Sequence, residues 1–238
     1  MKLFKNIKNW LENQEHLFYL FLFILIVPNM VLCFTEPLPF MAKVANVLLP
    51  FGCYYLLMTL SRNCGKMLWI LFLFLFFGAF QIVLLYLFGQ SIIAVDMFLN
   101  LVTTNSSEAL ELLDNLTPAI IAVIILYVPA LILGTISIIR KRKLTVEFIR
   151  RERKRAFLVF GISLLSLVGA YVQDSGYELK SDLYPLNVCY NVGLAFQRTA
   201  LTQDYHRTSK DFTFHARPTH PELSLIHISE PTRLALIS

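Results

Sequence analysis

Five long blocks of apolar residues alternate with short polar segments along the chain. Each block approaches or exceeds the roughly 20 residues that a helix needs to cross the hydrocarbon of a bilayer. Only helices and closed barrels satisfy every backbone group there, so each block predicts a membrane-spanning helix. The sequence therefore predicts an all-α membrane protein with spans at 17–34, 40–60, 67–88, 118–139 and 156–173.

The composition supports this division into spans and connecting segments. Charged residues make up 16% of the 238 residues and apolar residues 56%, whereas soluble domains keep roughly 25% charged. Pro28 and Pro50 lie within the first two blocks, where neighbouring helices can satisfy the freed carbonyls. The first block is long enough to span and lacks a small-residue cleavage site, so we expect no cleavable signal peptide.

Basic residues gather in alternate connecting segments, and this arrangement predicts the orientation of the chain. The segments 35–39 and 89–117 contain no Lys or Arg, and Lys43 can extend to the interface. We therefore expect a cytoplasmic N-terminus and a C-terminal region on the opposite side of the membrane. The loop 140–155 has a second interpretation as an anionic-lipid site, but a topology determinant is the simpler one. The basic residues are Lys2, Lys5, Lys8, Arg62, Lys66, Arg140, Lys141, Arg142, Lys143, Arg150, Arg151, Arg153, Lys154 and Arg155.

The segment 91–117 is amphipathic, lacks positive charge and is expected at the outer interface. Asn100, Thr104 and Glu108 recur every fourth residue, so one continuous helix would present all three on one face. An amide and a hydroxyl can donate to phosphate oxygens, while a carboxylate pairs with an ammonium group. The trio is therefore a candidate site for a zwitterionic lipid head group.

The same residues allow a purely structural interpretation. The run from Asn105 to Glu108 matches a capping box, with Asn105 as the N-cap and Glu108 at the third helical position. Glu108 would then begin a helix running to about Leu116. The residues alone favour this capping interpretation over a binding role.

Beyond these residues, the chain resembles the phosphoethanolamine transferases of the lipid A and related types. The resemblance covers residues 1–222: the five-span anchor, the basic loop before the fifth span and the Asn-xxx-Thr-xxx-Glu run. It extends to the stretches YPLNVCYNVGLAFQR and SKDFTFHARPTHPE. It implies that Asn100, Thr104 and Glu108 line the cavity for the lipid substrate, in a bacterial inner membrane.

The resemblance also implies a chemistry, the transfer of phosphoethanolamine from phosphatidylethanolamine to lipid A or another envelope acceptor. A Thr nucleophile and zinc would carry it, in a soluble α/β domain that begins with a strand and a Gly-Glu-Thr motif. No Gly-Glu-Thr occurs here, and His206, His215 and His220 do not match the expected metal positions. We therefore expect no catalytic or metal-binding residue in this chain, and no activity from it alone. The four cysteines also lack metal-ligand spacing.

After residue 173 the chain turns polar. Leucines and a tyrosine at helical spacing predict a helix on the membrane surface within a linker, 174–222. The final stretch contains LSLIHISEPTR, which reads as the translation of the transposon end of a widely used sequencing adaptor. We expect residues 223–238 to derive from that adaptor and exclude them from the fold.

Two other classes of function remain open. One is a non-enzymatic membrane protein, either a transporter or a scaffold, and the other is a related transferase of glycerol phosphate or of a periplasmic glucan. Neither a buried Asp, Glu or Arg within a span nor a repeat of broken helices supports a transporter. Much of the positive charge lies in one stretch, Arg140 to Arg155, between two predicted spans. Nucleic acid is therefore not an expected partner.

Overall fold

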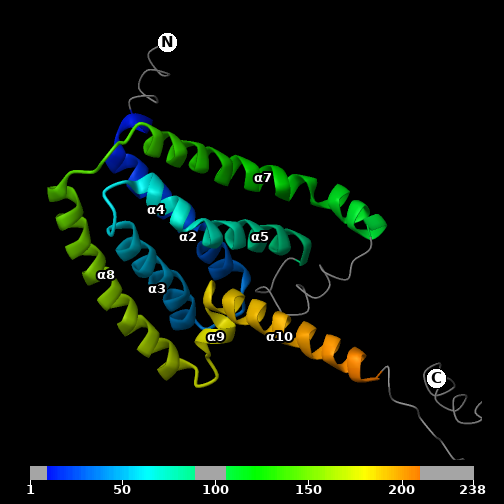
Figure 1. Cartoon of the computed structure of the whole chain (residues 1–238). Helices are drawn as coiled ribbons and strands as arrows, with labels where there is room; N and C mark the ends of the chain where they lie inside the picture. Colours follow the sequence, from blue (N-terminus) through cyan, green and yellow to red (C-terminus); the bar gives the residue numbers. More distant parts are fainter. Residues whose placement is uncertain (1–9, 89–105, 210–238) are drawn as a thin grey trace, which may run out of the picture. The chain divides into compact units, whose positions relative to one another are not determined.

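The computed structural model describes residues 10–88 and 106–209 (Figure 1). Within these ranges the regular secondary structure is helical, and there is no β-strand. This confirms the predicted all-α fold class. The helices are α2 Gln14–Thr35, α3 Phe40–Met58, α4 Cys64–Ile70, α5 Phe72–Phe88, α7 Ser106–Ile139, α8 Val146–Gln173, α9 Leu179–Asp182 and α10 Leu186–Ser209.

Four helical segments of the described chain are each long and apolar enough to cross a membrane. They are Gln14–Thr35, Phe40–Met58, Leu116–Ile139 and Val146–Gln173. The third predicted span is instead a pair of helices, α4 and α5, which meet at Leu71 with a bend of 64°. Neither Pro nor Gly marks this bend, so the hydropathy pattern could not reveal it. The described chain has four candidate spans, or five if the bent pair counts as one.

Helix α8 begins ten residues before the apolar block that predicts it. The Thr145 side chain accepts a hydrogen bond from the Phe148 amide at 3.2 Å and caps the helix. Arg, Lys and Glu are good helix formers, so the run 150–155 continues the helix instead of forming the expected loop. The basic residues there consequently have fixed helical faces.

Helix α7 likewise extends beyond its apolar block. It starts at Ser106 and continues to Ile139, through Pro118, without ending near Leu116. The end of the predicted outer segment is therefore continuous with the fourth span.

Close helix contacts hold the bundle together. Helices α3 and α8 share the most extensive contact and lie side by side in Figure 1. A Cβ at Gly52 of α3 would lie 3.1 Å from the Phe160 Cα. Helices α4 and α7 approach more closely still, since a Cβ at Gly65 would lie 2.1 Å from the Gly134 carbonyl oxygen. Small residues permit such backbone contact between membrane helices.

The chain divides into two compact units, 1–197 and 198–238. The first contains the bundle, and the described part of the second is the end of α10. Within the first unit, Tyr184 and Val188 are buried against Leu32, Leu84 and Leu85. The start of the predicted surface helix thus packs into the bundle. The proposed adaptor-derived stretch, 223–238, lies outside the described residues.

Candidate functional site

The basic segments converge at one end of the bundle. The Arg62 Nε donates to the Leu144 carbonyl at 3.0 Å, which joins the α3–α4 turn to the α7–α8 turn. The Arg142 Nη1 donates to the Glu12 carbonyl at 2.9 Å, which brings in the start of α2. These contacts confirm that the basic segments share a side, although residues 1–9 lie outside the description. We call this the basic end.

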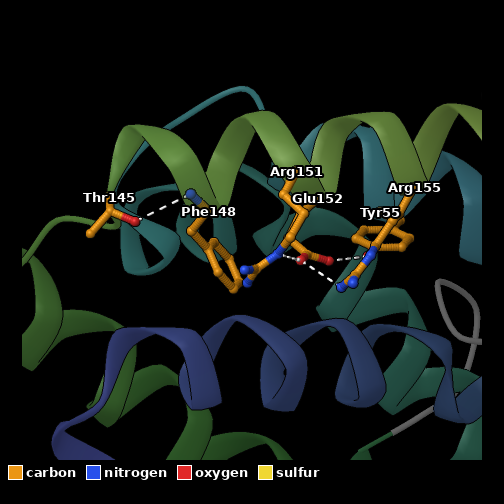
Figure 2. A network of polar contacts seen from close by, with 6 residues as sticks. All are labelled: Tyr55, Thr145, Phe148, Arg151, Glu152 and Arg155. Carbon is orange, nitrogen blue, oxygen red and sulfur yellow. Dashed lines mark hydrogen bonds and ion pairs between the residues drawn. The ribbon is translucent and has the colours of Figure 1, made fainter.

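A fully buried carboxylate also lies at the basic end. Glu152, on α8, has 0% exposure. Its Oε1 accepts hydrogen bonds from Arg151 and Arg155, both at 2.9 Å, and its Oε2 accepts one from the Tyr55 hydroxyl at 2.5 Å (Figure 2). Glu152 lies before the predicted span 156–173, in the segment expected to be a loop, which is helical because α8 extends through it.

The hydrogen bonds of Glu152 link two helices. They also occupy most of the acceptor positions of its carboxylate. Tyr55 belongs to α3, so its hydroxyl ties α3 to α8. The Arg151 guanidinium also lies 5.2 Å from the centre of the Phe148 ring. A carboxylate with three donors of this kind serves as a fixed charge in the helix packing. Its only sequence signal is that it is the single acid within the run RRERKR.

A second polar network lies toward the other end of α2 and α3, around two buried asparagines. The Asn29 Nδ2 donates to the Asn46 carbonyl at 2.9 Å and to the Tyr184 carbonyl at 2.7 Å. The Asn46 Nδ2 donates to the Asp182 carbonyl at 2.6 Å, and its Oδ1 accepts from the Tyr177 hydroxyl at 2.5 Å. Burial raises the pKa of Tyr177, so the phenol stays protonated and able to donate. The network fixes the segment after α8 on the bundle.

Several other buried polar groups have no partner among the described residues, and two of them lie close together. The hydroxyls of Tyr54, Tyr127 and Tyr184 and both amide atoms of Asn187 have no hydrogen-bond partner among the described residues. A Cβ at Gly78 would lie 3.0 Å from the Tyr127 hydroxyl and 3.4 Å from that of Tyr184. Tyr54 lines one cavity together with Leu183 and Pro185, the residues on either side of Tyr184. Asn187 follows Tyr184 by three positions and is buried as well. We call Tyr54, Tyr127, Tyr184 and Asn187 the tyrosine cluster.

The tyrosine cluster can both donate and accept hydrogen bonds, and its four side chains are neutral. Buried polar groups are nearly always bonded, so a set of orphaned ones indicates a missing polar partner, a ligand or ordered water. Hydroxyl and amide hydrogens can donate to phosphate oxygens, and the oxygens can accept from an ammonium group. Burial raises the pKa of Tyr184, which keeps that phenol neutral. The cluster suits an uncharged or zwitterionic group.

An apolar cavity of about 270 Å³ adjoins the cluster. Tyr54 belongs to its lining, which also includes Leu57, Phe74, Phe160 and Leu183. Apolar cavities exclude water and accept hydrocarbon. A polar head and an apolar chain could therefore occupy neighbouring parts of one site.

The structure does not test the lipid-binding role that the sequence predicts for three residues. Asn100, Thr104 and Asn105 lie outside the described residues. Glu108 lies in the first turn of α7, but its side chain is outside the description. Both the head-group and the capping hypotheses stay predictions.

The tyrosine cluster could not be found from the sequence. Tyr54 lies on α3, Tyr127 on α7 and Asn187 on α10, while Tyr184 precedes α10. No spacing along the chain connects such distant positions, and tyrosines in apolar blocks are ordinarily interfacial anchors.

In the described part of the chain, no three His, Cys, Asp or Glu side chains come together to hold a metal ion. The cysteines Cys33, Cys53, Cys64 and Cys189 are all free thiols. His215 and His220 lie outside the described residues.

No family model, curated protein or solved structure matches this chain. The length and hydropathy of the helices identify the broad class of the protein. This is a polytopic, all-helical membrane protein.

Proposed function

We propose that this membrane protein is the anchor and lipid-binding part of a phosphoethanolamine transferase. Its donor substrate would be phosphatidylethanolamine, and its acceptor lipid A or a related envelope molecule. The tyrosine cluster beside an apolar cavity carries the proposal. The sequence resemblance over residues 1–222 supports it.

The chemistry of the cluster fits this lipid class. Phosphatidylethanolamine has a phosphate that accepts hydrogen bonds and an ammonium group that donates them, with no net charge. Three hydroxyls and one amide could satisfy both without a counter-ion. The adjoining cavity could hold part of an acyl chain. Asn100, Thr104 and Glu108 would add an amide, a hydroxyl and a carboxylate on the outer face.

The transfer reaction itself would be carried out by residues beyond this sequence. The Thr nucleophile and its zinc would belong to an α/β domain following residue 222 in the uninterrupted protein. The present chain would orient the donor lipid for that domain and have no transfer activity alone. The N-terminus would lie in the cytoplasm, with the lipid site nearer the periplasmic face.

Lipid binding by the 238-residue chain tests the proposal. We would titrate phosphatidylethanolamine into the chain in phosphatidylcholine nanodiscs and count bound lipids by native mass spectrometry. The Tyr127→Phe/Tyr184→Phe variant should lose roughly tenfold or more in affinity, since two hydrogen bonds disappear. The control Tyr86→Phe/Tyr171→Phe removes two exposed hydroxyls and should leave binding unchanged.

Glu108 provides a second arm of this experiment. Glu108→Gln should weaken binding if Glu108 pairs with the ammonium group, whereas Asp114→Asn, about 120° around the same helix, should not. No preference of the wild-type chain for phosphatidylethanolamine would refute the proposal. Preference for a different small solute or lipid would favour a transporter or one of the related transferases.

A further inference from the structure

Helix α8 divides its basic residues between two environments at the basic end. Arg151 and Arg155 turn toward Glu152 and bond to its carboxylate (Figure 2). Arg150, Arg153 and Lys154 instead line a cavity of about 500 Å³. The single buried acid of this run thus neutralises the cations on one face and leaves the other face positively charged.

The lining of this cavity combines charge with apolar surface. Its seven described residues include four cations, no carboxylate and three apolar side chains. Phe157 is 61% exposed and Val146 47% exposed. We call this the basic pocket. Its lining residues are Arg62, Val146, Ile149, Arg150, Arg153, Lys154 and Phe157.

Two guanidiniums of the basic pocket are fixed by neutral acceptors. The Arg153 Nη2 donates to the Thr59 carbonyl at 2.8 Å, and the Arg62 Nε donates to the Leu144 carbonyl at 3.0 Å. A guanidinium has five N–H donors. Each arginine therefore keeps its full charge, and donors remain for an incoming anion.

The position of the pocket selects the kind of anion. Directly after Arg155, α8 becomes apolar and exposes Phe157, Leu158 and Leu165. The pocket therefore lies where the charged start of α8 meets its lipid-facing part, the level of lipid phosphates in a bilayer. Basic pockets between membrane helices bind anionic head groups.

We infer that the basic pocket is a binding site for an anionic phospholipid. The lipid phosphodiester would lie among Arg62, Arg150, Arg153 and Lys154, with its acyl chains along Phe157. This site is distinct from the tyrosine cluster, whose neutral groups suit a zwitterionic lipid. It also gives the basic run a specific role beyond setting the orientation of the chain.

Competition between lipids tests the inference. Phosphatidylglycerol would be titrated into the 238-residue chain in phosphatidylcholine nanodiscs, with bound lipid counted by native mass spectrometry. Arg150→Gln/Lys154→Gln should weaken binding roughly tenfold or more, since each cation near the surface contributes to attraction. Neither side chain makes a hydrogen bond or ion pair recorded among the described residues, so this variant should fold normally.

The matched control is Lys141→Gln/Lys143→Gln, which removes two cations at the basic end but outside the pocket; neither side chain has a hydrogen bond or ion pair among the described residues. It should leave the affinity for phosphatidylglycerol unchanged. Equal losses in both variants would mean general charge attraction and overturn the inference. Displacement of the lipid by millimolar glycerol phosphate would also overturn it, since the site would then serve a soluble phosphate. Unchanged binding of phosphatidylethanolamine in the pocket variant separates this result from the proposed function.

Discussion

The tyrosine cluster and the basic end both contain buried polar groups within a membrane-spanning bundle, but these groups differ in whether they have hydrogen-bond partners. At the basic end, Glu152 is buried and accepts hydrogen bonds from three donors. In the tyrosine cluster, three hydroxyls and an amide are buried and have no partner among the described residues. A satisfied network holds helices together, whereas an unsatisfied one has bonding capacity left for a ligand.

The two regions also differ in charge. The basic pocket beside Glu152 has four cations and no carboxylate in its lining, while the tyrosine cluster consists of neutral side chains. This difference in charge is the reason for proposing an anionic lipid at the first and a zwitterionic lipid at the second. The difference teaches that burial alone does not identify a binding site; the decisive property is whether the buried groups already have partners.

Removal of the buried carboxylate should have the largest effect on stability. Glu152→Ala leaves Arg151, Arg155 and Tyr55 without their shared acceptor. We expect a loss of about 2 kcal/mol in the free energy of unfolding, less than for a wholly buried pair because both guanidiniums are over half exposed. Unfolding by denaturant in detergent micelles measures it. The exposed Glu147→Ala should cost roughly 0.5 kcal/mol, and equal losses would contradict a structural role for Glu152.

Asn46 and Asn63 hold different regions of the bundle in place, so replacing each one should weaken the binding of a different lipid. Asn46→Ala frees the segment around Asp182 and should cost about 1–2 kcal/mol. It should speed tryptic cleavage after Lys180 and weaken binding of phosphatidylethanolamine.

The reciprocal variant is Asn63→Ala. Asn63 donates to the carbonyls of Ser137 and Arg142 at the basic end. This change should speed cleavage at 140–143 and weaken binding of phosphatidylglycerol instead. If either variant weakened both lipids equally, the two regions would not be independent.

The smallest expected effect is a difference in stability between variants of two neighbouring tyrosines. Tyr55→Phe removes a donor to Glu152 and should destabilise the protein by about 1 kcal/mol. Tyr54→Phe removes a buried hydroxyl without a partner, so stability should stay the same or rise by up to about 1 kcal/mol. Paired thermal unfolding curves measure both. A loss for Tyr54→Phe as large as that for Tyr55→Phe would show that the Tyr54 hydroxyl is bonded in the empty protein.

Some of these features were predictable from the chain itself. The apolar blocks determined the all-α class, and the positions of Pro28 and Pro50 inside α2 and α3 followed directly. The alternation of basic segments predicted their meeting at one end. These properties are local, because the cost of placing a residue in hydrocarbon depends on that residue and its immediate neighbours.

The tertiary structure decided the rest. The bend at Leu71, the burial of Glu152 and the division of cations along α8 depend on which helix faces meet. Tyr127 and Tyr184 come together only because distant parts of the chain pack around Gly78. Hydropathy records how apolar a segment is but not the direction in which each side chain points, and both proposed lipid sites depend on those directions.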